Sequence, residues 1–238
     1  MDRREILYSP LITPPIPSDL DISKLEEWII DVHPQKMMNL SFSSSTAHAE
    51  LKEKYPWNLS FAKFKNLGYL DNFEILFPQF IEHLCVSFDV EERDIGVIVF
   101  LPVKKDLIGR GFFHSDNDTG GLRMYLVNEN PDTNPLLMIP TKQPYETRPY
   151  DFKSVFEPGD PILQDKILKA KLPTSASAFY LNNIRAVHAP EINVPSKRIA
   201  VTIVGNPEEK IIKKTQQLLE RSVEKYKDYV LRWSKDET

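Results

Sequence analysis

The sequence contains a single cysteine, Cys85, and only eight glycines among its 238 residues. One cysteine excludes an intrachain disulfide, and the charged N-terminus lacks an apolar leader, so we expect a cytoplasmic protein. No apolar run reaches the roughly 18 residues that a membrane-spanning helix needs. Acidic and basic residues nearly balance, at 34 against 30. Neither nucleic acid nor a membrane is therefore expected as a partner.

Hydrophobic residues make up 41% of the chain, which is enough for one large domain with its own core. We expect a single domain over residues 1–238, with an N-terminal arm and helices in 1–90. The proline-rich stretch 9–18 predicts an extended arm on the surface. Helical spacing of apolar residues predicts short helices near 22–32, 45–54 and 72–85.

Short, apolar and β-branched runs dominate the middle of the sequence, and turn clusters separate them. Such runs predict strands; they cover residues 95–103, 122–127, 135–139, 178–181 and 198–204. Short strands with irregular connections favour a mainly β sandwich or barrel over a parallel sheet. No glycine-rich phosphate loop follows any of them.

The last part of the chain, 207–234, has the pattern of a long amphipathic helix. Its apolar face includes Leu218, Tyr226 and Trp233, and lysines and glutamates cover the other face. This face either covers the sheet or forms the contact of a homodimer.

His114 and Asp116 are the first candidates for chemistry, because residues i and i+2 of an extended strand point to the same side. His188, just beyond a predicted strand, is the best candidate for a third ligand. Two histidines and one carboxylate on one face suit non-haem iron(II), since the opposite positions stay open. Asp118 is a rival to Asp116, but its spacing of four from His114 suits a helix better.

Arg198 strengthens this interpretation, because it lies ten residues after His188 at the start of an apolar strand. Alternation puts Arg198, Ala200 and Thr202 on one face. A guanidinium can bind a carboxylate with two parallel hydrogen bonds, and an arginine facing a barrel interior would be costly without such a partner.

The set of His114, Asp116, His188 and Arg198 resembles the iron(II)/2-oxoglutarate oxygenase superfamily. The stretch 121–126, GLRMYL, is similar to a strand of the aspartyl/asparaginyl β-hydroxylases and free-proline hydroxylases. The resemblance covers about residues 95–205. It implies a double-stranded β-helix, a cupin-like jelly-roll with flanking N-terminal helices and a long C-terminal helix.

The same resemblance assigns roles to the residues. His114 and Asp116 would lie around the second of eight core strands, and His188 would start the seventh. Iron(II), 2-oxoglutarate and O2 would be the cofactor and cosubstrates, and Arg198 would bind the distal carboxylate of 2-oxoglutarate. Because Asp116 is present, hydroxylation is expected rather than the halogenation of relatives that lack this carboxylate.

The sequence departs from that subfamily in two places. The stretch between His114 and His188 is longer than in compact proline hydroxylases, which indicates an insertion at about 141–171. This insertion is either a lid over the substrate or a surface excursion. Many members also carry a proline after the strand arginine, where this chain has Val127 and Asn128.

Four further residues are candidates for the site. Arg123 and Tyr125 share a strand face; Arg123 either clamps a substrate carboxylate or forms a surface ion pair. Tyr125 either hydrogen-bonds 2-oxoglutarate or belongs to the core. Asn182 either orients the site or stabilises its own turn. Arg185 either contacts the substrate or is a solvated loop residue.

The expected function is hydroxylation of a small molecule, most plausibly a free amino acid or a derivative. Alternatives are an oxygenase acting on a protein or peptide side chain, and a non-oxidative, metal-dependent cupin-type enzyme. A binding module with a vestigial site is a third, although the intact ligand set disfavours it.

Overall fold

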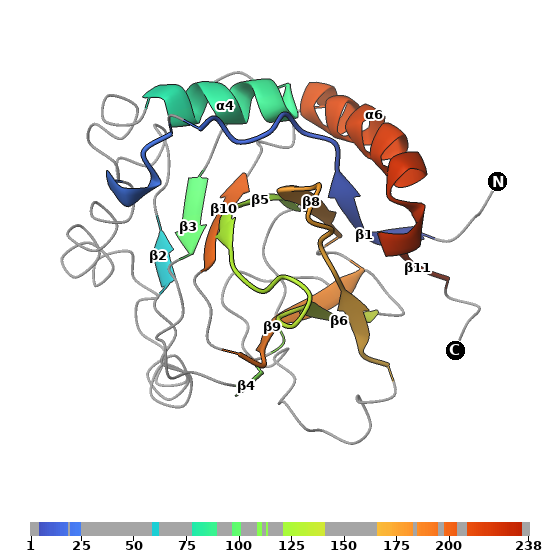
Figure 1. Cartoon of the computed structure of the whole chain (residues 1–238). Coiled ribbons are helices and arrows are strands. Elements are labelled where there is room, and N and C mark those ends of the chain that lie inside the picture. Colours follow the sequence, from blue (N-terminus) through green and yellow to red (C-terminus); the bar gives the residue numbers. More distant parts are fainter. Residues whose placement is uncertain are drawn as a thin grey trace, which may run out of the picture.

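Over the residues that it describes, the computed structural model is mainly β, with antiparallel sheets and the helices α4 (Pro78–Phe88) and α6 (Glu209–Lys225) (Figure 1). The structure describes residues 5–18, 20–24, 59–61, 78–89, 97–100, 109–110, 113, 121–140, 166–182, 185–194, 198–203 and 209–234.

The larger sheet has seven strands in the order β11-β1-β8-β5-β10-β3-β2. Their bounds are Leu231–Trp233 (β11), Glu5–Leu11 (β1), Ala178–Leu181 (β8), Gly121–Asn128 (β5), Arg198–Ile203 (β10), Val97–Phe100 (β3) and Leu59–Phe61 (β2). Every neighbouring pair in this sheet is antiparallel. The predicted strands at 122–127, 178–181 and 198–204 are confirmed.

The smaller sheet has four strands in the order β4-β9-β6-β7. Their bounds are Gly109–Arg110 (β4), Ala186–Ile192 (β9), Leu136–Pro140 (β6) and Leu168–Ala170 (β7). β9 pairs antiparallel with both β4 and β6. The sheet lies opposite the larger one (Figure 1), so that β3 to β10 pass back and forth between two facing layers.

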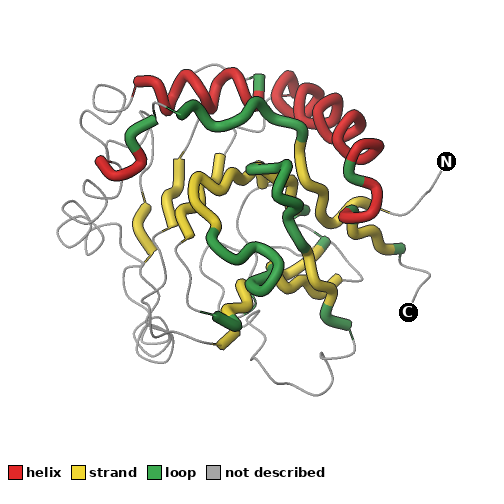
Figure 2. The backbone as a smooth tube through the Cα atoms, in the orientation of Figure 1, coloured by secondary structure: helices red, strands yellow, loops and turns green. Residues whose placement is uncertain are grey.

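Two helices, α4 (Pro78–Phe88) and α6 (Glu209–Lys225), cover the outer face of the larger sheet. Phe80 and Leu84 of α4 and Leu218 of α6 pack on Leu122 and Met124 of β5. The chain after β1 runs along α4 (Figure 2) and adds apolar side chains to this cluster. The predicted covering of the sheet by the C-terminal helix is thereby confirmed.

A second apolar cluster fills the space between the two sheets. Leu136 and Met138 of the smaller sheet pack there with Phe179 and Leu181 of β8. The other face of the smaller sheet carries a third cluster, which includes Leu137, Val187 and Ala189. Because both faces of β9 are covered, its burial does not follow the alternation of a half-exposed strand.

The prediction of an extended surface arm at 9–18 was wrong for its first residues. Ser9 to Leu11 belong to β1 and are buried, with β8 as their neighbour. A proline is tolerated at position 10 because β11 pairs with β1 only as far as Tyr8. Beyond that point β1 is an edge strand, where a missing N–H costs no ladder hydrogen bond.

The predicted helix at 207–234 also ends early. α6 stops at Lys225, a short 3-10 turn follows, and Trp233 lies in β11, paired with Glu5. Trp233 packs between the sheets rather than on the helix face. A large aromatic side chain gains more from that buried site than from a half-covered helix face.

Other expectations are corrected in part or lie outside the described residues. The expected insertion at 141–171 contains a strand, β7, so its last residues are part of the smaller sheet. Helix α4 spans Pro78–Phe88, whereas the expected helix spanned 72–85. The expected helix at 45–54 and residues 141–165 lie outside the described residues. Among those described, no helix is long and apolar enough to cross a membrane.

His83 of α4 predicts a pH dependence of stability. It is buried, its Nε2 lies 3.4 Å from Ser87 Oγ, and burial lowers its pKa. Between that lowered pKa and the unfolded value of about 6.5, the unfolded chain binds more protons. The free energy of unfolding therefore rises with pH through this window. The contribution of His83 is fully present above the unfolded pKa and is lost as pH falls toward the lowered pKa.

We expect His83→Gln to reduce this slope, measured as urea midpoints at about pH 5 and pH 7.5. Equal slopes in the two proteins would contradict it.

Candidate active site

His188 lies in the middle of β9, and only 1% of its surface is exposed. In the register with β6 it lies opposite Met138, whose side chain packs in the cluster between the sheets. Residues directly opposite in an antiparallel pair share a face, so His188 faces the interior between the two sheets. An imidazole at this position can act as a metal ligand.

The other two expected ligands, His114 and Asp116, lie outside the described residues. Their neighbour Phe113 is described, is buried, and packs with Val187 and Ala189, the two residues that flank His188. Within the described part of the chain no group of three metal-ligating side chains is found. The three-ligand set therefore stays a prediction.

Arg123 and Tyr125 share the inner face of β5, as predicted. Arg123 lies opposite Phe179, and Phe179 and Tyr125 both belong to the cluster between the sheets. Arg123 is only 6% exposed, and burial lowers its pKa to about 10. It therefore keeps its charge at neutral pH, inside the protein rather than in a surface ion pair.

An aromatic group lines the same interior. The Phe179 ring lies 5.1 Å from the Tyr125 ring and 5.4 Å from the Tyr8 ring, measured between centroids. The Tyr8 hydroxyl donates to the Lys171 carbonyl at 3.0 Å. Burial, with a smaller effect of Tyr125, raises the Tyr8 pKa well above its ordinary value. Tyr8 therefore stays neutral within the apolar cluster between the two sheets.

Arg198 occupies the first position of β10, directly opposite Asn128 at the end of β5. Further along the same pair, Ala200 is opposite Tyr125 and Thr202 is opposite Arg123. The positions 198, 200 and 202 thus belong to the inner face. This agrees with the face that alternation predicts for Arg198.

Asn182 and Arg185 lie at the turn between β8 and β9. The Asn182 side chain accepts from the Arg185 backbone N–H at 3.1 Å and donates to the Ile6 carbonyl at 3.2 Å. The Arg185 guanidinium forms an ion pair with Glu5 at 2.7 Å. Both side chains thus tie this turn to β1. A role of either in substrate binding is not tested by these contacts.

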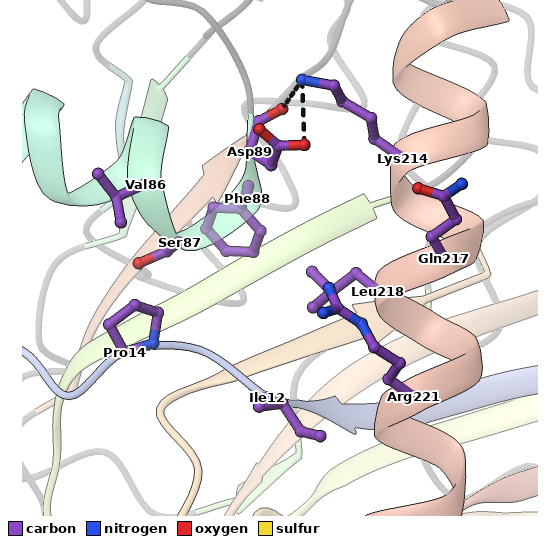
Figure 3. Close-up of a pocket in the computed structure, with 10 residues that line it drawn as sticks. All are labelled: Ile12, Pro14, Val86, Ser87, Phe88, Asp89, Lys214, Gln217, Leu218 and Arg221. Atoms are coloured by element: carbon purple, nitrogen blue, oxygen red, sulfur yellow. Dashed lines mark hydrogen bonds and ion pairs between the residues drawn. The ribbon is translucent and has the colours of Figure 1, made fainter.

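A groove of about 190 Å³ lies between α4, α6 and the chain that follows β1 (Figure 3), and His188 is not among the residues that line it. At one end Lys214 of α6 bridges to α4, with its ammonium 3.1 Å from the Asp89 carboxylate and 2.6 Å from the Asp89 carbonyl. Phe88 and Leu218 form part of its floor. These contacts join the two helices to each other, and we assign the groove to helix packing.

Sequence reasoning placed Phe179 and Met138 in buried strands without assigning their face, and it missed Tyr8 as a residue of the interior. Residues 135–139 are apolar throughout, so alternation gave no signal for the face of Met138. No strand signal marks Tyr8 in the sequence, because the proline-rich stretch that follows it is typical of an extended surface arm. The pairing of β1 with β8 is what brings Tyr8 inside.

No family model matches the chain, and no curated protein matches it. Among solved structures, the chain is similar to EvdMO1, with a TM-score of 0.39 and 16% identity over 86% of this chain. It spans about half of EvdMO1, 48% of that chain. It is also similar to AviO1 from Streptomyces viridochromogenes Tue57, with a TM-score of 0.38 and 13% identity. That match covers 86% of this chain and 91% of AviO1.

Proposed function

We propose that this protein is an iron(II)- and 2-oxoglutarate-dependent oxygenase that hydroxylates a small, carboxylate-bearing molecule, a free amino acid or a derivative. The observation that carries the proposal is the position of His188 and Arg198 in the order of the strands. His188 faces the interior from β9, and Arg198 begins the next strand on the facing sheet.

The strand order supports a double-stranded β-helix. If β3 to β10 are numbered as core strands one to eight, the larger sheet contains the order six-three-eight-one. The smaller sheet has the order two-seven-four-five. Eight antiparallel strands that alternate in this way between two sheets are expected of a jelly-roll. β9 is then the seventh strand, which the resemblance assigns to His188.

Phe113 supports a metal site near His188. It packs beside Val187 and Ala189, on the face of the smaller sheet opposite to that of His188. His114 and Asp116 lie outside the described residues, and we propose that they lie on the His188 side, where a chain extended from Phe113 would place them. The donor set of two imidazoles and one carboxylate would bind iron(II) on one face and leave positions for 2-oxoglutarate and O2.

Arg123 and Arg198 lie at different positions along the paired strands β5 and β10, which supports separate sites for two carboxylates. Arg198 lies opposite Asn128, and Arg123 lies five residues earlier on β5. At about 3.3 Å per residue the two positions are roughly 15 Å apart along the strand. Arg123 is the closer of the two to Asp116 in the chain. Arg198 would thus hold the distal carboxylate of 2-oxoglutarate, and Arg123 the carboxylate of the substrate.

When bound, iron(II) would supply the activation of O2, the oxidant: one oxygen atom of O2 would enter succinate as 2-oxoglutarate gives two electrons and loses carbon dioxide, and the other would enter the hydroxylated substrate. The chain orients the two carboxylates and keeps water out. The ring group of Tyr8, Tyr125 and Phe179 supplies apolar surroundings beside Arg123. Such dry, preorganised surroundings are what a reactive oxidant requires.

The decisive experiment is anaerobic addition of iron(II) and then 2-oxoglutarate to the whole chain. We expect a weak visible charge-transfer band, and succinate after O2 and a panel of amino acids are added. Arg198→Ala should weaken 2-oxoglutarate affinity by roughly a hundredfold, since a bidentate, charge-assisted pair is lost. Iron(II) affinity should stay unchanged.

Arg221→Ala, a change at an exposed arginine of α6, serves as the control and should alter neither affinity. Absence of the band together with absence of succinate would overturn the cosubstrate assignment. Succinate formed only with a peptide or protein would replace the small-molecule substrate by a protein side chain.

A further inference from the structure

We propose that Asn128 is a positioning residue that orients the Arg198 guanidinium for the distal carboxylate of 2-oxoglutarate. This inference rests on the proposed function. It starts from the backbone register, in which Asn128 and Arg198 are directly opposite each other in the β5–β10 pair. Side chains of such a pair lie on the same face of a sheet, with Cβ atoms about 5 Å apart.

A bulge in β5 is what turns Asn128 inward. Val127 is opposite Ile199, but Tyr125 is opposite Ala200, so Leu126 is an extra residue on β5. Leu126 and Val127 consequently both pack in the outer cluster beneath the helices. Simple alternation from Tyr125 would point Asn128 outward, whereas one extra residue brings it back to the inner face.

The Asn128 side chain has an unused acceptor at that position. Its Oδ1 is buried and has no hydrogen-bond partner in the described part of the chain. A buried amide oxygen without a donor costs free energy, and in native proteins such atoms usually have an explanation. A guanidinium has five N–H donors and uses two for a bidentate carboxylate. A third N–H can therefore serve the amide oxygen.

Such a contact would fix the plane of the guanidinium. Arg198 stands at the first position of β10, where strand pairing alone leaves a long side chain several rotamers. An acceptor on the opposite residue selects one of them before the ligand arrives, so less entropy is lost on binding. Asn128 would thus raise 2-oxoglutarate affinity without touching the metal.

The test is a double-mutant cycle on 2-oxoglutarate affinity, measured by anaerobic titration calorimetry with iron(II) present. We expect Asn128→Leu to weaken 2-oxoglutarate binding by about tenfold to a hundredfold and to leave iron(II) binding unchanged. Asn128→Gln, which keeps an uncharged amide acceptor, should recover part of the loss. In the Arg198→Ala background, Asn128→Leu should have almost no further effect.

Asn193→Leu, at the end of β9 in the other sheet, is the matched control and should leave 2-oxoglutarate affinity unchanged. An Asn128→Leu protein with normal affinity, or with a loss fully additive to that of Arg198→Ala, would overturn this inference and leave the proposed function intact. A wild-type protein that binds no 2-oxoglutarate would overturn both.

Discussion

Replacing His188 by glutamine is expected to abolish the iron-dependent activity and to lower iron(II) affinity by more than about a hundredfold. Loss of a residue that only orients a metal ligand costs about tenfold to a hundredfold, and loss of a ligand should cost at least as much. Glutamine nearly preserves the volume of the buried imidazole, so the core between the sheets should stay filled. Anaerobic titration with iron(II), followed by the visible band with 2-oxoglutarate, measures the effect.

His83→Gln is the matched control for this experiment. His83 is also a buried histidine, but it lies on α4 beneath the outer cluster, on the other side of the larger sheet from His188. It should bind iron(II) and form the band as the wild type does. If both variants keep the band, His188 is a core residue and the metal site is wrongly assigned. Thermal unfolding of each variant identifies losses that come from misfolding.

The second large effect is expected for Arg123→Met. If Arg123 holds the substrate carboxylate, its removal should raise the substrate KM by roughly thirtyfold to a thousandfold, since a buried charge loses its partner. Iron(II) and 2-oxoglutarate affinities should not change. Arg123→Lys should rescue little, because an ammonium cannot form the two parallel hydrogen bonds of a guanidinium. Succinate release with the best substrate of the amino-acid panel gives the KM values.

A comparison of the acid with its amide tests the same contact from the ligand side. The wild type should prefer the carboxylate, and Arg123→Met should lose this preference. Arg221→Met, at an exposed site on α6, should keep it. A purely structural role for Arg123 predicts a different result, namely a loss of about 3 to 5 kcal/mol in stability with the carboxylate preference retained.

The candidate site also explains why the faces of β5 differ so strongly. Leu122 and Met124 pack under the helices, while Arg123 and Tyr125 face the interior. The side chains of the outer face are those of an ordinary core. The inner face buries a cation whose pKa falls to about 10 through desolvation. Burying a guanidinium is costly, and the substrate carboxylate that we propose for Arg123 would offset part of that cost.

The sequence by itself determined the type and approximate bounds of several elements. Runs such as 178–181 and 198–204 predict strands because β-branched and aromatic side chains favour a pleated, buried backbone. Alternation also assigned Arg123 and Tyr125 to one face, which the β5–β8 pairing bears out. His188 could be proposed as a third ligand beside His114 and Asp116, supported by its spacing to Arg198, without any knowledge of its burial.

Only the tertiary structure decided the features that depend on long-range pairing. β1 and β11 lie at opposite ends of the sequence, yet they pair at the edge of the larger sheet and bury Tyr8 and Trp233. Local propensity cannot predict such contacts, because the hydrogen-bond partners and the apolar surface come from distant segments. The bulge at Leu126 also depends on the pairing of two distant segments, β5 and β10. A register is set by two strands together, and it is this register that places Asn128 opposite Arg198.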